Sequence, residues 1–287
     1  MFVMKAPGKI NWFLSVLNRR EDGYHNIRSL MQCVDLYDTL LFEEADELEV
    51  ISDIQGLHIG QNLVYRAAMI MKCRIRERKG ARITLRKEIP LASGMGGGSS
   101  DAAYALMGLN RLWELNLKRE TLMEMGAEIG SDVPFFIGNF CSIVEGRGEV
   151  ITPVTCAPSL TLLLVNPGIP VSAAWAYQAL RPGLTKKSVD IKLFCQTLDR
   201  KDFDVLRPMM INDLEEAVIS AYPEIGRIKN RLRDVGAEAS AMSGSGSTVF
   251  GVFRSSKEAM HAAKSFGPYW HRVVSPLSNQ GSNTEAN

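Results

Sequence analysis

The order of hydrophobic and polar positions predicts a mixture of strands and helices along the first half of the chain. Apolar residues that alternate with polar ones indicate strands, and apolar residues that recur at helical spacing indicate helices. Strands are predicted at 10–17, 39–44 and 81–89, helices at 62–80, 99–115 and 118–129, and a hairpin at 141–151. Asn62 is expected to cap the first helix and Gly80 to end it.

The second half of the chain begins after the segment TPVTCAPS at 152–159, where prolines interrupt any regular element. Strands are predicted at 160–168, 237–242, 247–253 and 270–275, and helices at 173–181, 213–220, 224–235 and 256–266. The pattern predicts an α+β protein with one domain over residues 1–155 and another over 156–276. The polar tail, 277–287, is expected to be disordered.

Composition narrows the class of protein. The chain has 287 residues, 46% of them hydrophobic, which is enough for two domains with a core each. A formal net charge of +1 without a long basic run gives no indication of a nucleic-acid partner, so a small ligand is favoured. The five cysteines are scattered and contain no C-x-x-C, which argues against a disulfide framework and a zinc site. We expect a soluble protein of the reducing cytoplasm, because neither a signal-peptide profile nor an apolar run of about 18 residues occurs.

The segment PLASGMGGGSSDAA at 90–103 is rich in glycine and joins a predicted strand to a predicted helix. Glycine lets an anion approach the backbone, and the first N–H groups of a helix attract negative charge, so the segment predicts a phosphate site. The alternative is a flexible turn whose two serines cap the helix. The segment is not a P-loop, since no lysine follows its glycines, and its position does not fit a dinucleotide fingerprint.

Three shorter segments carry further candidates for chemistry. In KAPGKIN, Lys9 and Asn11 occupy alternate positions of a strand and are expected to face the same side. The alternative for Lys9, considered alone, is a lysine exposed to solvent. In GSDVPFF, Asp132 is either a turn former or an active-site base. The segment SGSGS at 243–247 is a second glycine-rich turn, which is most often only a hairpin.

Taken together, these segments resemble the three signature motifs of the GHMP kinase superfamily, which includes galactokinase and the homoserine, mevalonate and phosphomevalonate kinases. The motifs are PGKIN, PLASGMGGGSSDAA and MSGSGS, and they occur in the expected order. Within the superfamily, the segments DGYHNIRSLMQCVDLYDTL, IGSDVPFF and EGRGE look like the branch whose substrate carries a cytidine diphosphate.

The resemblance implies a two-domain GHMP kinase fold, with an N-terminal domain like domain 2 of ribosomal protein S5, a ferredoxin-like C-terminal domain and a cleft between them. It further implies ATP as the phosphoryl donor, with Mg²⁺ expected, and the 2-hydroxyl of a methylerythritol unit as the acceptor. The sequence shows no set of carboxylates that would bind Mg²⁺, and Ser100 is the one candidate neighbour of the ion. The oligomeric state is left open.

Matching the motifs residue by residue assigns the catalytic pair to Lys9 and Asp132. The implied ATP contacts are Pro90, Ser93, Gly94, Met95, Gly96, Gly97, Gly98, Ser99 and Ser100, with Gly244 and Gly246 helping to close the site. The implied substrate contacts are Asn11, Tyr24, His25, Asp132, Ser172, Trp175 and Tyr177. Tyr24 would stack on the pyrimidine and His25 would bond its edge, while either Trp175 or Tyr177 would supply the opposite face.

Two other functions remain to be weighed against a kinase. A nucleotide or metabolite sensor could keep the fold without the reaction, although Lys9, Asp132 and the whole glycine segment are present. An oxidoreductase with a dinucleotide site is disfavoured by the position and sequence of the glycine segment. A nucleotide-depletion assay with ATP and Mg²⁺, compared with NADH absorbance, would separate the three, and ADP release with a panel of alcohols would be the most informative single experiment.

Overall fold

The computed structural model describes residues 1–53, 59–76, 79–156, 158–180 and 189–278. Contacts divide the chain into two compact units. The first unit contains residues 1–8, 36–91 and 96–139, and the second contains 9–35, 92–95 and the chain from 140 onward. Each unit is discontinuous in sequence, and the domain boundary near residue 155 stays a prediction.

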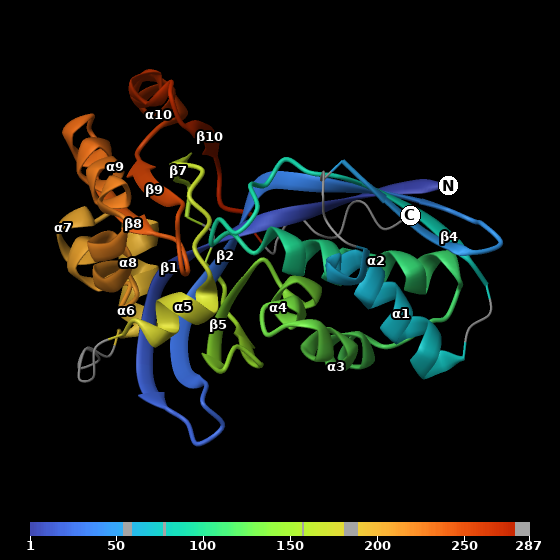
Figure 1. Ribbon diagram of the computed structural model, residues 1–287. Helices are drawn as coiled ribbons and strands as arrows, with labels where there is room; N and C mark the ends of the chain where they lie inside the picture. The colour runs from blue at the N-terminus through green and yellow to red at the C-terminus, as the bar shows by residue number, and fades with distance from the viewer. Residues whose placement is uncertain (54–58, 77–78, 157, 181–188, 279–287) are drawn as a thin grey trace. The chain divides into compact units, whose positions relative to one another are not determined.

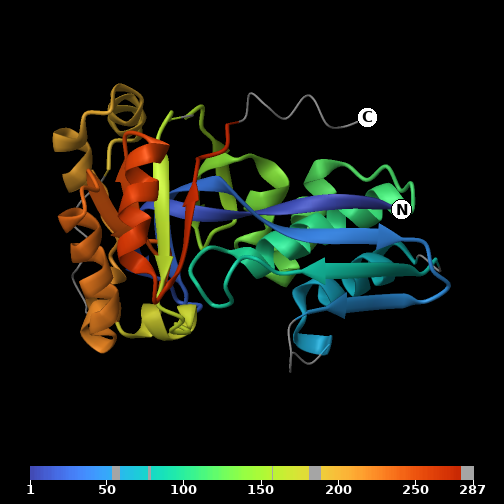
Figure 2. The same cartoon turned by 90° about the horizontal axis from the view of Figure 1, so that it is seen from above.

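In the first unit, helices cover one face of a sheet (Figure 1). Strand β2 (His25–Glu43) pairs antiparallel with β4 (Ala81–Arg86), which pairs parallel with β3 (Leu48–Ser52). Figure 2 shows these strands side by side in blue and teal. The helices are α1 (Leu63–Ile75), α2 (Gly97–Leu112), α3 (Arg119–Ile129) and α4 (Val133–Gly138), with a 3₁₀ turn at Ile59–Gln61. The ring of Phe42 fills the space that a side chain at Gly108 would need, so α2 lies close against the sheet.

The second unit contains an antiparallel sheet of four strands in the order β10-β7-β9-β8. These strands are β7 (Thr161–Asn166), β8 (Ala239–Met242), β9 (Val249–Phe253) and β10 (Trp270–Val274). The α-helices are α5 (Ala173–Gln178), α6 (Ile191–Arg200), α7 (Phe203–Leu206), α8 (Glu215–Ala221), α9 (Pro223–Asp234) and α10 (Ser256–Ala263). Arg207–Met209 and Lys264–Phe266 form 3₁₀ turns.

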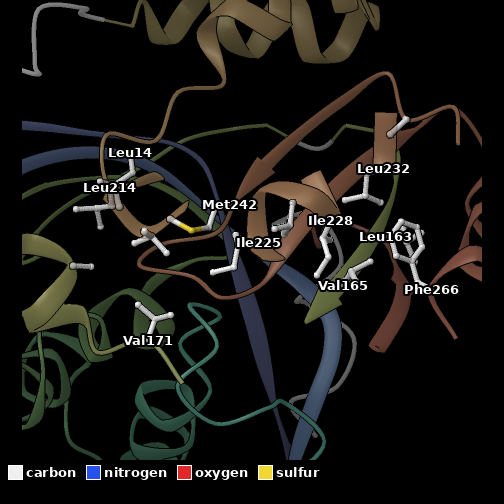
Figure 3. Packing of buried hydrophobic residues seen from close by; sticks show 14 of the residues in the cluster. Leu14, Leu163, Val165, Val171, Leu214, Ile225, Ile228, Leu232, Met242 and Phe266 are labelled. Carbon is white, nitrogen blue, oxygen red and sulfur yellow. The ribbon is translucent and has the colours of Figure 1, made fainter. Parts of the chain in front are cut away.

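Helix α9 contributes three residues to the core next to this sheet. Ile225, Ile228 and Leu232 recur at helical spacing and are buried. Figure 3 shows them among the side chains of Leu163 and Val165 from β7. Burial of these apolar side chains fixes which face of α9 meets the sheet.

The second unit also contains the N-terminal strand from Lys9 onward. Strand β1 (Phe2–Arg19) pairs with β2, and β2 pairs with β5 (Cys141–Gly146), which forms an antiparallel hairpin with β6 (Val150–Pro153). The ring of Trp12 lies 5.8 Å from that of Phe250, edge to face, and the ring of Phe13 lies 5.6 Å from that of Phe194. Aromatic packing therefore joins residues from the start of the chain to the C-terminal sheet.

Most predicted elements are confirmed, but several boundaries are wrong. Asn62 does cap α1, with its Oδ1 accepting from the Val64 N–H at 2.9 Å. The helix ends at Ile75 and not at Gly80, because Arg76 adopts the left-handed conformation (φ 57°) and its N–H bonds the Lys72 carbonyl. Gly80 instead allows a close approach to the backbone of residues 45–47.

Helix α2 begins at Gly97 and ends at Leu112, so the predicted limits of 99 and 115 were both too late. Helices α6 and α7 were not predicted. Each has an aspartate cap that the sequence displays, since Asp190 accepts from Leu193 N at 3.0 Å and Asp202 accepts from Val205 N at 3.4 Å. The tail prediction for 277–287 falls largely on residues outside the described ones. No helix among the described residues is long and apolar enough to cross a membrane.

Candidate active site

The glycine segment enters helix α2 through three residues at positive φ, which are Ala92 (φ 48°), Gly94 (φ 77°) and Gly96 (φ 69°). Gly96 is the N-cap residue and provides no side-chain cap. The first bond of the helix runs from Ser100 N to Gly96 O at 2.9 Å, so the N–H groups of Gly97, Gly98 and Ser99 lie outside the helical ladder. Amides at a helix N-terminus, together with the helix dipole, form an anion site.

Glycine is required at position 94 by the turn between β8 and β9. A Cβ on Gly94 would overlap the Ser243 carbonyl oxygen, and the Gly94 carbonyl accepts from Ser243 Oγ at 3.0 Å. The Thr248 N–H also bonds the Ser93 carbonyl at 3.1 Å. The predicted hairpin at 243–247 is confirmed, and it packs directly on the first part of the glycine segment.

The other residues of the segment differ in what they could offer a ligand. Met95 and Ser93 are buried, and the Met95 carbonyl accepts from Lys9 N at 2.9 Å. Pro90 and Ser99 are half-buried. Ser100 is fully buried, and its Oγ has no hydrogen-bond partner among the described residues.

Lys9 is held at the centre of a buried polar chain. Its Nζ donates to Asn11 Oδ1 at 2.6 Å and to the Gly94 carbonyl at 3.0 Å. Asn11 Nδ2 donates to Ser29 Oγ at 2.8 Å, and Ser29 Oγ donates to the Phe13 carbonyl at 2.6 Å. The predicted common side for Lys9 and Asn11 is therefore confirmed, and the ammonium is fixed next to the glycine segment.

Asp132 belongs to the first unit, where it is the residue before helix α4 and is half-buried. Its backbone is αR (φ −83°, ψ −13°), and its side chain makes no cap hydrogen bond. Close packing of Gly126 against Val133 fixes the start of α4. The pairing of Asp132 with Lys9 stays a prediction, since each side chain is described within its own unit.

The predicted cytidine contacts in the second unit include two aromatic clusters. The rings of His25 and Tyr177 are stacked, with centroids 5.5 Å apart and planes 19° apart. Trp175 instead packs edge to face on Tyr222 at 5.5 Å. Tyr177 is thus the aromatic residue of α5 that contacts His25. Ser172 caps this helix by accepting from Trp175 N at 3.4 Å.

Tyr24 is 56% exposed, and the Arg147 guanidinium lies over its ring at 5.0 Å from the centroid. A cation in this position is attracted to the aromatic face. Sequence reasoning missed Arg147, although the segment EGRGE that contains it was part of the resemblance. Burial lowers the pKa of His25, and the positive charge of Arg19 lowers it further, so the imidazole is neutral at pH 7.

No group of three or more His, Cys, Asp or Glu side chains within the described residues is arranged to hold a metal ion. All five cysteines are free. Ser100 Oγ, buried and without a partner among the described residues, is an oxygen donor of the kind that a divalent cation prefers.

Comparison with known proteins shows which class of protein the chain belongs to. The model of the GHMP kinases N terminal domain matches residues 62–139, and that of the GHMP kinases C terminal domain matches 192–268. The 4-diphosphocytidyl-2-C-methyl-D-erythritol kinase of Thermodesulfovibrio yellowstonii is 47% identical over 281 residues, covering 96% of this chain and 98% of the relative. The enzyme of the same name from Geobacter metallireducens is 44% identical over 265 residues, covering 91% and 92%.

A solved structure agrees with these relatives. The crystal structure of a 4-(cytidine 5'-diphospho)-2C-methyl-D-erythritol kinase superposes with a TM-score of 0.83 at 32% identity, covering 96% of this chain and 99% of the other. The fold is that of a two-domain GHMP kinase, a small-molecule kinase. Within that class, the chain belongs to the 4-diphosphocytidyl-2-C-methyl-D-erythritol kinase family.

Proposed function

We propose that the protein transfers the γ-phosphoryl group of ATP to the 2-hydroxyl of 4-diphosphocytidyl-2-C-methyl-D-erythritol, releasing ADP and the 2-phosphate. The names of the relatives support the substrate. The observation that carries the kinase reaction is the set of amides at Gly97, Gly98 and Ser99, which lie outside the helical ladder at the start of α2. Free thiols are consistent with a reaction in the cytoplasm.

The glycine segment is assigned to the phosphates of ATP, which supplies the group to be transferred. The amides at the start of α2 donate to phosphate oxygens, and the helix dipole favours their charge. Ser100 Oγ is the candidate neighbour of Mg²⁺, which would otherwise be held by phosphate oxygens and water. Pro90, Ser93 and Met95 are assigned to shaping the segment, because the serine and the methionine are buried.

Lys9 and Asp132 are assigned to the acceptor hydroxyl and the moving phosphoryl group. Phosphoryl transfer passes through a loose transition state, so positioning and charge neutralisation matter more than a strong base. Asp132 orients the hydroxyl and accepts its proton late in the reaction. Lys9 offsets negative charge on the phosphoryl group, and Asn11 keeps the ammonium oriented through the 2.6 Å bond.

Tyr24, His25 and Tyr177 are assigned to the cytosine. A neutral imidazole has one donor and one acceptor nitrogen, and the edge of cytosine offers an amino donor beside the N3 acceptor. Arg147 covers one face of the Tyr24 ring, so the base would stack on the other face. Tyr177 holds the His25 ring by stacking on it and is favoured over Trp175, which packs on Tyr222. Ser172 remains a candidate contact to the substrate's phosphates.

The test is ADP release with ATP and Mg²⁺ in the presence of the cytidyl substrate, mevalonate, homoserine or galactose. We expect turnover with the cytidyl substrate alone. Equal turnover with mevalonate or homoserine would contradict the assigned substrate. Binding of ATP and the cytidyl substrate without turnover would favour a sensor.

The base contacts are tested with Tyr24→Ala and His25→Ala. Loss of stacking should cost on the order of 1–3 kcal/mol in substrate binding, by analogy with stacking on nucleic-acid bases. His25→Ala should also narrow the preference for cytidyl over uridyl substrate, because a hydrogen-bonding site rejects a mismatched edge strongly. Trp175→Phe serves as the control on the same helix. An unaltered KM for the cytidyl substrate in Tyr24→Ala would remove this residue from the site.

A further inference from the structure

Three buried charged side chains meet beneath the start of helix α2, within the first unit. The Lys87 ammonium contacts Asp38 Oδ2, and it contacts Asp101 Oδ2 at 2.6 Å. The side chains of Lys87, Asp38 and Asp101 are 9%, 0% and 4% exposed. We call these three residues the charge cluster. Lys87 follows β4 and Asp101 lies in α2, so the cluster joins the two ends of the glycine segment.

Asp38 also fixes the backbone that leads into the glycine segment. Its Oδ1 accepts from the N–H of Glu88 at 2.6 Å and from the N–H of Ile89 at 2.9 Å. One carboxylate thus binds two consecutive amides of the chain and the ammonium of Lys87. This arrangement holds the segment from 87 to 89 against strand β2.

The segment from 87 to 89 in turn packs against Gly97, the first residue of α2. A Cβ on Gly97 would lie 3.0 Å from Ile89 Cγ2 and 3.1 Å from Lys87 Nζ. Asp101, one helical turn beyond Gly97, then bonds the same ammonium. Two kinds of contact therefore fix the first turn of α2. Gly97 packs against Ile89 and Lys87, and Asp101 bonds the Lys87 ammonium.

Stability alone does not account for these buried charges. Desolvation of an ion costs several kcal/mol, and well-packed apolar residues often replace buried ion pairs without loss of stability. The carboxylates of Asp38 and Asp101 also share the single ammonium of Lys87, so one positive charge faces two negative charges. Consistent with this, Asp101 Oδ1 has no hydrogen-bond partner among the described residues. A geometric role explains the cluster better than an energetic one.

We infer that the charge cluster is a positioning device for the ATP phosphates. It fixes the distance between the first turn of α2 and residues 87–89. The amides of Gly97 to Ser99 therefore keep the geometry of an anion site. Lys87 and the two aspartates act through the backbone and are not catalytic residues. This inference rests on the proposed assignment of the glycine segment to ATP.

The experiment compares Asp101→Ala and Asp101→Leu with wild type. Both variants remove the bond between α2 and Lys87 while leaving Lys87 paired with Asp38, and leucine also fills the vacated volume. Glu49→Ala is the matched control, because Glu49 pairs with Arg82 at 2.7 Å on the exposed part of the same sheet. Calorimetry gives the Kd of ATP, steady-state kinetics gives both KM values and kcat, and circular dichroism gives Tm.

We expect the Kd and KM of ATP to rise on the order of 10- to 100-fold in both Asp101 variants, by analogy with the roughly 10²-fold loss of rate that a small misplacement of a positioned group causes. The KM of the alcohol substrate should stay at its wild-type value, and Glu49→Ala should change none of these constants. An unchanged ATP affinity in a folded Asp101 variant would overturn the inference, as would an equal rise in both KM values with a fall in Tm. Absence of ATP binding by the wild type would instead reject the proposed function.

Discussion

Replacing Asp132 with asparagine separates the shape of this side chain from its charge. If Asp132 orients and deprotonates the acceptor hydroxyl, the variant should bind both ligands normally while kcat falls about 10²–10⁴-fold, the range typical of a positioned proton transfer. Steady-state kinetics with direct binding measurements would show this. Asp234→Asn, an exposed position in α9, is the control. Wild-type turnover in Asp132→Asn would exclude it from the mechanism.

Gly98→Ala tests the proposed phosphate site without disturbing the packing beneath it. A Cβ on Gly98 would lie 3.4 Å from Leu63 Cδ1, an ordinary contact, whereas one on Gly97 would press on Lys87 and Ile89. Alanine in a helix is more favourable than glycine by about 0.5–1 kcal/mol, so Tm should rise. The KM of ATP should nevertheless increase, because the methyl group blocks the approach of phosphate to the backbone.

Gly267→Ala is the control for this substitution, since Gly267, the residue after the 3₁₀ turn, has an αR backbone (φ −45°) that alanine also adopts, and a Cβ there meets nothing within 4 Å. It should leave the KM of ATP unchanged. A rise in Tm with unchanged ATP affinity in Gly98→Ala would mean that the segment is only a turn.

The sequence predicts single residues well where their neighbours are close along the chain. The bond between Lys9 and Asn11 follows from strand alternation. The charge cluster was missed because Lys87 and Asp38 are 49 residues apart and no local pattern links them. Arg147 was missed for the same reason, since its contact with Tyr24 depends on the pairing of β2 with β5.

At the scale of the element, helix caps give a direct stability test. Asn62→Ala removes the bond to Val64 N and should lower the free energy of unfolding by about 0.5–2 kcal/mol. Helix α3 offers the converse case, because its N-cap is Lys118, which makes no side-chain cap hydrogen bond. Lys118→Asp should raise the free energy of unfolding by about 1 kcal/mol. Urea denaturation of both variants measures these changes, and equal effects of the same sign would contradict the capping argument.

Elements were predicted where one face is buried at helical spacing, as in α9, and where a side chain next to the helix caps it, as Asn62 does for α1. The end of α1 was wrong because Arg76, and not a glycine, adopts the left-handed conformation. The first half of β2 was not predicted as a strand, since it is almost wholly buried and so shows little alternation. The missed half of β2 shows how burial in the folded protein can override the local pattern.

At the scale of the whole molecule, the charge cluster makes stability depend on pH. Burial raises the pKa of Asp101 to about 7, the Asp38 carboxylate adds to the rise, and Lys87 opposes it. An unfolded aspartate titrates near 4. The folded state therefore binds the proton more tightly, and the contribution of Asp101 to stability is present below pH 4 and is lost as the pH rises to about 7.

Asp101→Asn should flatten the fall in the free energy of unfolding between pH 4 and about 7, as measured by urea denaturation at each pH. Asp234→Asn is again the control and should keep the wild-type slope. Identical slopes for wild type and Asp101→Asn would show that this carboxyl does not titrate in that range.

The two-domain kinase fold was predicted from motifs. No sequence motif indicates that residues 9–35 belong to the same compact unit as residues 140 onward. Contact between distant segments depends on the complete topology, so a linear reading that divides the chain near residue 155 cannot detect it. The predicted halves, 1–155 and 156–276, would each lack part of the second unit.

This discontinuity has a consequence for synthesis on the ribosome. Trp12 and Phe13 leave the exit tunnel early, but their partners Phe194 and Phe250 are translated much later. At about 5–20 residues per second, the delay is on the order of 10–50 s. During that interval the nascent chain carries exposed aromatic side chains that no local structure can bury. The second unit must therefore form late in translation or after it.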